Sequence, residues 1–281
     1  MQFTSPEGER RYAELVRAAE TVAIGLDFDG VLSPIVEDPA TAHIHPEAGD
    51  MLADLAAQVR AIAVITGRPA RQALALGGLE EVGNRIGDAG RELFLFGQYG
   101  NERWSSTNRR IISPRPPHGL STFLLELPAV LRRAGAQDAH IEEKGLAVAV
   151  HTRRLSDPGA AARRLAGPLG ELAAAHDLIV EPGRNVLEVR APGMHKGHAV
   201  RTLVDEVGAG GFLFAGDDLG DVEAFAEVGR LHDEGLPTLL VCSGSDEQRA
   251  LVDLADVVVD GPEGVIGLLR QLTEDAGAVR A

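Results

Sequence analysis

The sequence predicts an α/β protein: a Rossmann-like core built on a doubly wound parallel sheet, with an α+β unit inserted into it. Two observations lead to this fold class. Apolar segments of strand length recur along the chain, and most of them end in Gly, Asp, Ser or Thr. Helical patterns separate several of these segments, which is the alternation of a doubly wound sheet, whereas the middle of the chain shows paired segments typical of β-hairpins.

The core strands are predicted from continuous apolar runs. Such runs suit strands that are buried on both faces, as in a parallel sheet. They lie at residues 22–26, 61–65, 93–96, 212–215, 238–241 and 257–259, with helical patterns at residues 48–60, 198–207 and 222–228. Ligands of such sheets bind beyond the carboxyl ends of the strands. We therefore expect four polar residues that follow these runs to gather at one edge: Asp27, Thr66, Asp217 and Ser243.

The middle of the chain predicts a separate unit. After three prolines, a helical pattern at residues 120–133 precedes segments 139–143 and 146–153, which flank a Lys144-Gly145 turn. A second helical pattern at residues 158–176 precedes segments 178–181 and 185–190, which flank a Pro182-Gly183 turn. This order predicts an antiparallel sheet with helices on one face. We expect a core of residues 1–110 and 192–281 and an inserted domain of residues 111–191.

Charge and composition exclude several classes of protein. The chain has 281 residues and a net charge of −15, which argues against a nucleic-acid surface and gives no long-range attraction for an anionic substrate. It has no run of about 18 apolar residues and no signal-peptide pattern, so we expect a cytoplasmic protein without a membrane partner. The single cysteine, Cys242, excludes an internal disulfide. The oligomeric state stays open, and a monomer fits the sequence.

An acidic pair follows the first core strand. Asp27 and Asp29 lie two residues apart, and Gly30 permits a sharp turn directly after them. One aspartate can attack phosphorus to form an aspartyl phosphate, while a second carboxyl group protonates the leaving oxygen and later activates water. Taken alone, the pair is equally consistent with two acids that cap the next helix.

Two further strand ends carry matching polar groups. After residue 65, the hydroxyl of Thr66 and the backbone N–H groups of Gly67 and Arg68 can hold phosphoryl oxygens as a helix begins. After residue 215, three acids follow within one helical turn, and they are Asp217, Asp218 and Asp221. Several carboxylates around one point, without histidine or cysteine, are the donor set that Mg²⁺ prefers. Three matching strand ends favour a phosphate-handling site over isolated helix caps.

Lysine is rare in this chain. Of the 27 basic residues only Lys144 and Lys196 are lysine, so arginine serves almost wherever a general cation is needed. Lys196 precedes a predicted helix, where its ammonium group can hold Asp27 ionised and help to neutralise a phosphoryl group. The alternative is a solvated surface cation.

The four segments with Asp27, Thr66, Lys196 and Asp217 resemble, in order and spacing, the four motifs of the haloacid dehalogenase superfamily of phosphotransferases. Within that superfamily, several strings are similar to the trehalose-6-phosphate phosphatases: "LDFDGVLSPIVEDP", "TGR", "FGQYGNERW", "IEEKGLAVAVHTRR", "VLEVRAPGMHKG" and "GDDLGDVEAF". The resemblance covers nearly the whole chain, and it implies that the inserted domain is a mobile cap over the site.

The resemblance also implies roles for individual residues. Asp27 would be the nucleophile, Asp29 the general acid/base with its backbone carbonyl on the metal, and Thr66 and Lys196 the phosphoryl ligands. Magnesium would bind Asp27 and Asp217, with Asp218 and Asp221 ligating directly or through water. Four cap residues match positions associated with sugar hydroxyls: Glu142, Lys144, Arg184 and Glu188.

The implied reaction is hydrolysis of trehalose 6-phosphate to trehalose and phosphate. Departures from the family strings at Asn101-Glu102-Arg103 and Thr152 leave the sugar open. One alternative is a phosphatase of sucrose phosphate or a glycosyl-3-phosphoglycerate. Another is a non-catalytic regulator that binds a sugar phosphate, although both acids of the first motif are present.

Overall fold

The computed structural model describes residues 2–36, 38–183, 185–244 and 251–280. The chain divides into two compact units, Met1–Ser113 with His195–Ala281, and Pro114–Met194. We call them the core unit and the inserted unit. The sequence-based boundaries, after residues 110 and 191, lie close to these positions.

The core unit is built on a mixed sheet, and the predicted α/β fold class is confirmed. Its strand order is β1-β12-β11-β10-β2-β3-β4-β5, and the pairs from β12 to β4 are parallel. The strands are β1 (Gln2–Phe3), β2 (Val22–Leu26), β3 (Ala61–Ile65), β4 (Leu93–Gly97), β5 (Glu102–Ser105), β10 (Gly211–Gly216), β11 (Thr238–Gly244) and β12 (Val257–Asp260). The antiparallel edge strands β1 and β5 were not predicted, because neither forms an apolar run of strand length.

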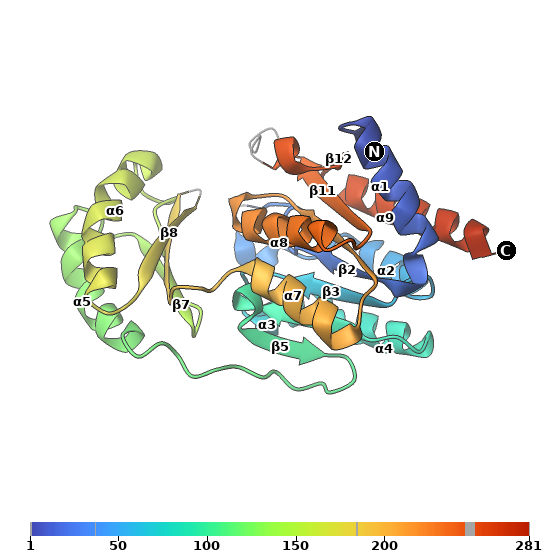
Figure 1. Cartoon of the computed structure of the whole chain (residues 1–281). Coiled ribbons are helices and arrows are strands. Elements are labelled where there is room, and N and C mark those ends of the chain that lie inside the picture. The colour runs from blue at the N-terminus through green and yellow to red at the C-terminus, as the bar shows by residue number, and fades with distance from the viewer. Residues whose placement is uncertain (1, 37, 184, 245–250, 281) are drawn as a thin grey trace. The chain divides into compact units, whose positions relative to one another are not determined.

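Helices cover both faces of this sheet (Figure 1). On one face pack α1 (Pro6–Arg17), α2 (Ala48–Ala56), α3 (Ala70–Gly77), α4 (Leu79–Asp88) and α9 (Gly261–Arg280). On the other pack α7 (Lys196–Val207) and α8 (Val222–Asp233). Because successive strand residues point to opposite faces, Val22, Ile24 and Leu26 face the first group of helices, whereas Ala23 faces the second.

Helix α2 is shorter than the predicted segment 48–60. The N–H of Ala57 donates to Asp54 and that of Gln58 to Leu55, so the last turn tightens and the helix ends. The N–H of Arg60 then donates to Val22, which starts the chain into β3.

The inserted unit has a four-stranded antiparallel sheet of order β6-β7-β9-β8. Its elements are α5 (Leu120–Arg133), β6 (His140–Glu143), β7 (Ala147–His151), α6 (Pro158–Ala174), β8 (Ile179–Gly183) and β9 (Val186–Arg190). Both helices pack on one face of this sheet, where they share a core with Val148, Val150, Leu187 and Val189.

The predicted Pro182-Gly183 turn is wrong. Both residues belong to β8, where Pro182 pairs with Leu187 and Gly183 with Val186. Because β8 is an edge strand, Pro182 can lie in it: proline has no N–H, and at an edge this does not cost the sheet interior a hydrogen bond. The turn therefore lies further along the chain, where Asn185 has φ +55°.

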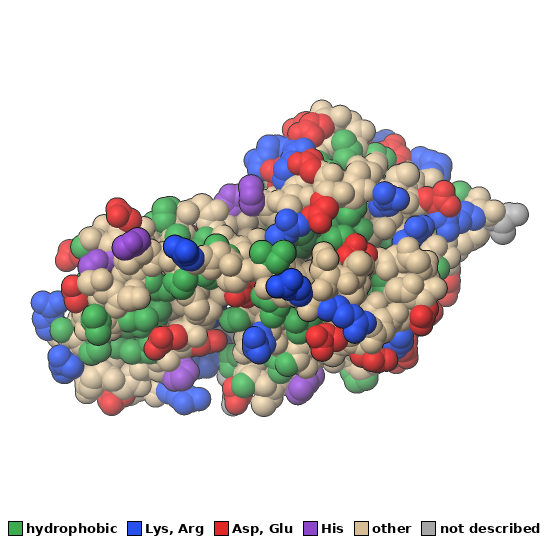
Figure 2. Space-filling model, turned by 90° about the horizontal axis from the view of Figure 1, so that it is seen from below, with side chains coloured by type: hydrophobic (Ala, Val, Ile, Leu, Met, Phe, Trp, Pro, Cys, Tyr) green, Lys and Arg blue, Asp and Glu red, His purple; other side chains and the backbone are tan. Residues whose placement is uncertain are grey.

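The surface carries no broad basic stripe on the face that Figure 2 shows, where Lys and Arg are interspersed with Asp and Glu. Among the helices of the described residues, none is long and apolar enough to cross a membrane.

The core of the inserted unit gives a matched test of packing on α5. Leu127 is fully buried, whereas Leu125 on the same helix is 83% exposed. We expect Leu127→Ala to lower the free energy of unfolding by about 2–5 kcal/mol, because it removes buried methyl groups and leaves a cavity. Leu125→Ala should change it by less than about 0.5 kcal/mol. Urea denaturation followed by circular dichroism measures both, and equal effects would contradict this packing.

Candidate active site

The first acidic residue lies at the carboxyl end of β2. Asp27 is 4% exposed, and its N–H donates to the carbonyl of Ala215 at 3.0 Å, so it continues the pairing of β2 with β10. Gly30 follows with φ +70°. A Cβ at Gly30 would lie 2.2 Å from Oδ2 of Asp217, so only glycine lets this turn approach the second acidic strand end. The hydroxyl of Ser243, after Cys242 in β11, donates to the carbonyl of Gly30 at 2.6 Å.

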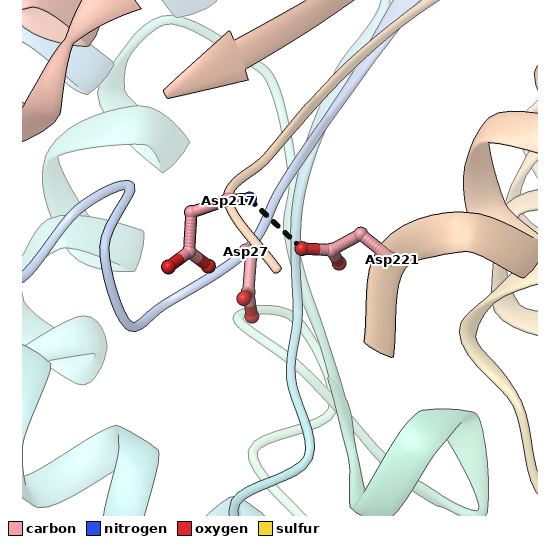
Figure 3. Close-up of side chains that lie close together, drawn as sticks. All are labelled: Asp27, Asp217 and Asp221. Carbon is pink, nitrogen blue, oxygen red and sulfur yellow. Dashed lines mark hydrogen bonds between the residues drawn. The ribbon is translucent and has the colours of Figure 1, made fainter. Parts of the chain in front are cut away.

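Three carboxylates converge at this edge of the sheet. Asp27, Asp217 and Asp221 are buried, and each has an oxygen within 4.8 Å of oxygens of the other two. Figure 3 shows the side chains of Asp27 and Asp217 side by side, with Asp221 approaching from the start of α8. Lys196, the first residue of α7, places Nζ 2.7 Å from Asp27 and 2.7 Å from Asp221.

The other two predicted acids hold the loop before α8. One oxygen of Asp221 accepts the N–H of Asp217 at 3.0 Å, while its other oxygen faces Lys196. Asp218 is exposed, and its Oδ1 accepts the N–H of Gly220 at 2.8 Å. Asp218 and Asp221 thus form a capping box. Metal ligation by either residue stays a prediction.

Burial and charge crowding govern the ionisation of this cluster. Burial raises the pKa of Asp27 well above its usual value, although the attraction of Lys196 opposes this shift. Burial, followed by repulsion from Asp27, raises the pKa of Asp217 to about 10. For Lys196, burial alone would lower the pKa, but attraction by Asp221 and Asp27 raises it well above the usual value.

Three buried carboxylates therefore face one ammonium group, and the excess negative charge fits a cation. The donors are carboxylate oxygens, which is the set expected of a hard cation such as Mg²⁺. Asp27 and Asp217 are the residues best placed to hold it, because the oxygens of Asp221 already serve Lys196 and the loop N–H groups.

Arg68 holds the carboxylate of Asp29. The sequence singled out Arg68 but did not predict this pairing. Arg68 donates from Nε and Nη2 to the two carboxylate oxygens of Asp29, at 2.7 and 2.6 Å, and from Nη1 to the carbonyl of Pro39 at 2.8 Å. The guanidinium also lies 5.3 Å from the ring centroid of Phe28. A bidentate pair fixes the direction of a carboxylate as well as its charge. Direct substrate binding by Arg68 stays a prediction.

The loop with Thr66 leaves two groups for an anion. The hydroxyl oxygen of Thr66 accepts the N–H of Arg68 at 3.1 Å, so its own proton can be donated elsewhere. The N–H of Gly67 makes no hydrogen bond within the described residues. By contrast, the first N–H group of α3 already has a partner, because the N–H of Ala70 donates to the carboxylate of Glu102 at 2.6 Å. Of the two backbone N–H groups expected from the sequence, that of Arg68 donates to Thr66, and phosphoryl binding by Gly67 stays a prediction.

Three of the predicted sugar-binding residues lie together in the inserted unit. Glu142 and Glu188 both pair with Ala149 in the sheet register, so they lie in one row on one face. Lys144 places Nζ 2.6 Å from Glu188. His151, which sequence reasoning did not single out, places Nε2 2.9 Å from Glu142. Arg184 lies outside the described residues.

With this geometry in place, comparison with known proteins identifies the family. A family model for trehalose-phosphatases matches residues 25–92 and 132–257. The chain belongs to the trehalose-phosphatase family. This confirms the resemblance inferred from the sequence strings.

The chain is also similar to individual proteins and to a solved structure. The trehalose-phosphate phosphatase of Mycobacterium tuberculosis is 31% identical over 304 residues, which cover 95% of this chain and 69% of that protein. An uncharacterized glycosyl hydrolase of the same organism is 33% identical over 243 residues, but the chain spans only 17% of its length. The trehalose-6-phosphate phosphatase C-terminal domain of Candida albicans superposes with a TM-score of 0.76 at 19% identity, covering 97% of this chain and 98% of that one.

The ionisation of Asp217 predicts how stability varies with pH. Its pKa is about 10 in the folded protein against an ordinary 3.8, so the folded state binds more protons between these values and stability falls as pH rises. We expect the Tm of the metal-free protein to fall from about pH 6 to about pH 9, and Mg²⁺ to raise the Tm more at the higher pH.

Thermal melts of Asp217→Asn provide the comparison. This variant should show a flatter pH dependence and a smaller shift with Mg²⁺, while Asp54→Asn, an exposed position on α2, should behave as the unaltered protein does. A shift with Mg²⁺ that is equal at both pH values would contradict the proposed ionisation.

Proposed function

We propose that this protein hydrolyses trehalose 6-phosphate to trehalose and phosphate through an aspartyl phosphate on Asp27. One observation carries the proposal: the buried carboxylate of Asp27 is paired with Lys196 and lies next to Asp217. Two residues further along the chain, Arg68 orients the carboxylate of Asp29. In this proposal Asp27 is the nucleophile, Lys196 the neighbouring positive charge and Asp29 the general acid/base, and all three lie near the carboxyl end of β2. Membership of the trehalose-phosphatase family supports the choice of substrate.

Each chemical step has a residue in a suitable place. Asp27 attacks phosphorus in line with the leaving sugar oxygen, and Asp29 gives that oxygen a proton. Asp29 then takes a proton from the water that cleaves the aspartyl phosphate. Thr66, Gly67 and Lys196 hold the phosphoryl oxygens while these bonds change. When Mg²⁺ is bound by Asp27 and Asp217, it reduces the repulsion between the attacking carboxylate and the phosphate dianion.

The inserted unit supplies the sugar contacts in this proposal. Glu142 and Glu188 offer carboxylate oxygens that accept hydrogen bonds from sugar hydroxyls, and Lys144, next to Glu188, offers a donor. Arg184 completes the set expected from the sequence. In this role the inserted domain, which the sequence placed at residues 111–191, acts as the cap of the core.

The setting of the reaction is part of the same proposal. We infer a cytoplasmic enzyme that acts on a small sugar phosphate as a monomer, without a nucleic-acid or membrane partner. The buried single cysteine fits a reducing compartment.

Replacing the nucleophile tests the mechanism directly. We expect Asp27→Asn to lower kcat for trehalose 6-phosphate at least about a thousandfold, because an amide cannot form the aspartyl phosphate. Phosphate release in the presence of Mg²⁺ measures this, with Asp54→Asn as the control for a change of charge at an exposed site. Substantial release by Asp27→Asn would refute Asp27 as nucleophile.

A panel of sugar phosphates tests the substrate. We expect kcat/KM to be highest for trehalose 6-phosphate among a set that includes sucrose 6-phosphate, a glycosyl-3-phosphoglycerate and glucose 6-phosphate, and turnover to require Mg²⁺. Parity between trehalose 6-phosphate and glucose 6-phosphate would reject the proposed substrate. Tight binding without turnover in Mg²⁺ would instead favour the regulatory alternative.

A further inference from the structure

The turn between β4 and β5 has an uncommon backbone. Gln98 and Tyr99 have φ of +45° and +59°, and Gly100 follows with φ +94°. Among the described residues, this is the one place where two adjacent non-glycine residues have positive φ. The left-handed region costs free energy for residues other than glycine, so surrounding contacts must hold such a pair in place.

Those contacts are made with the loop that carries Thr66. The N–H of Tyr99 donates to the carbonyl of Thr66 at 2.9 Å, and the N–H of Gln98 donates to the carbonyl of Arg68 at 2.8 Å. The left-handed conformation thus directs two successive N–H groups to the carbonyls on either side of Gly67. Gly67 is the residue whose own N–H faces no described partner.

The Tyr99 side chain closes the same loop from one side. A Cβ at Gly67 would lie 2.9 Å from both Cζ and Oη of Tyr99, closer than non-bonded atoms approach. The phenol ring therefore packs directly on the glycine backbone and leaves it no room to shift toward the turn. The φ of Gly67 is not in the left-handed region, so a methyl group at position 67 is opposed by this ring, which would have to move to admit it.

The opposite side of the turn contacts the helix that begins with Lys196. A Cβ at Gly100 would lie 2.9 Å from Cβ of Ala199, which is one helical turn after Lys196 in α7. The turn therefore lies between the two elements that present phosphoryl ligands, the Thr66 loop and the start of α7. A simple hairpin connection between β4 and β5 requires none of these contacts.

We infer that Tyr99 is a positioning residue for phosphoryl transfer: its ring and its left-handed backbone hold the Thr66 hydroxyl and the Gly67 N–H where the phosphoryl oxygens bind. This inference rests on the proposed function of the same site. Tyr99 acts through Thr66 and Gly67 and needs no contact with the substrate itself.

Two substitutions at Tyr99 separate the ring from the hydroxyl. Tyr99→Asn keeps a residue that adopts positive φ readily but removes the ring. We expect it to lower kcat at least about tenfold and to weaken orthovanadate binding in Mg²⁺ by a similar factor, because displacement of a catalytic loop by about 1 Å has effects of this size. Its Tm should stay close to that of the unaltered protein. Tyr99→Phe, which keeps the ring, should retain kcat and vanadate affinity within about threefold.

Gly67→Ala tests the contact from the other side. The added methyl group would collide with the ring, so we expect kcat and vanadate affinity to fall. In the double variant Gly67→Ala/Tyr99→Asn the methyl group has room, and the combined loss should be smaller than the product of the single losses. Arg109→Asn is the control, because Arg109 also has positive φ in the core unit but lies outside the site, and it should leave kcat unchanged.

The outcomes are distinct. Wild-type kcat and vanadate affinity in Tyr99→Asn would overturn the inference, as would a lower Tm with unchanged kcat, which indicates a purely structural residue. An equal loss in Tyr99→Phe and Tyr99→Asn would also overturn it, because the hydroxyl would then act directly.

Calorimetric binding of orthovanadate with Mg²⁺ needs no turnover. If the unaltered protein fails to hydrolyse trehalose 6-phosphate, the proposed function fails while the vanadate comparison still tests Tyr99.

Discussion

The arrangement of the core unit depends on the ion pairs of one buried ammonium group. Lys196 contacts Asp27 at the end of β2 and Asp221 directly before α8, and so joins β2, α7 and the loop before α8. The two helices are joined again further along, where the buried Glu227 of α8 accepts hydrogen bonds from Arg201 of α7 at 2.6 Å and from Arg230 at 2.7 Å. Removing the ammonium group would leave buried carboxylates without compensation, which costs more than the pairing gains.

This local arrangement shows how the proposed reaction on a phosphate ester is compatible with a net charge of −15. Long-range attraction is absent, so positive charge has to be local: Lys196 supplies it, and the buried carboxylates could hold a cation that adds to it. Burial, followed by repulsion from Asp27, raises the pKa of Asp217, and that repulsion between carboxylates also favours a divalent cation there. Arg68 adds charge beside Asp29, where its two hydrogen bonds fix the direction of that carboxylate.

The sequence predicted the parts of the fold that depend on local pattern. Continuous apolar runs predicted the positions of the parallel strands. The polar residues that follow three of these runs, Asp27, Thr66 and Asp217, were predicted to gather at one edge of the sheet. Features that depend on contacts between distant segments were missed. The Arg68–Asp29 pair joins residues 39 positions apart, and the Glu102 cap of α3 joins residues 32 apart. The Pro182-Gly183 error has a similar cause, because a proline is acceptable in a strand only if that strand is at an edge, and strand order is a tertiary property.

The return crossing from the inserted unit ends at Met194, and Lys196 opens helix α7 two residues later. The two crossings are therefore unequal in what they can tolerate. The first, at Ser113 and Pro114, follows the edge strand β5 and precedes a segment without regular structure, so its length can change with little effect on the sheet. At the second crossing only His195 lies between Met194 and Lys196, so an inserted or deleted residue would alter the short segment that leads directly into α7. An exchange of inserted units between relatives can thus vary the length of the entry, but it must keep the length of the exit.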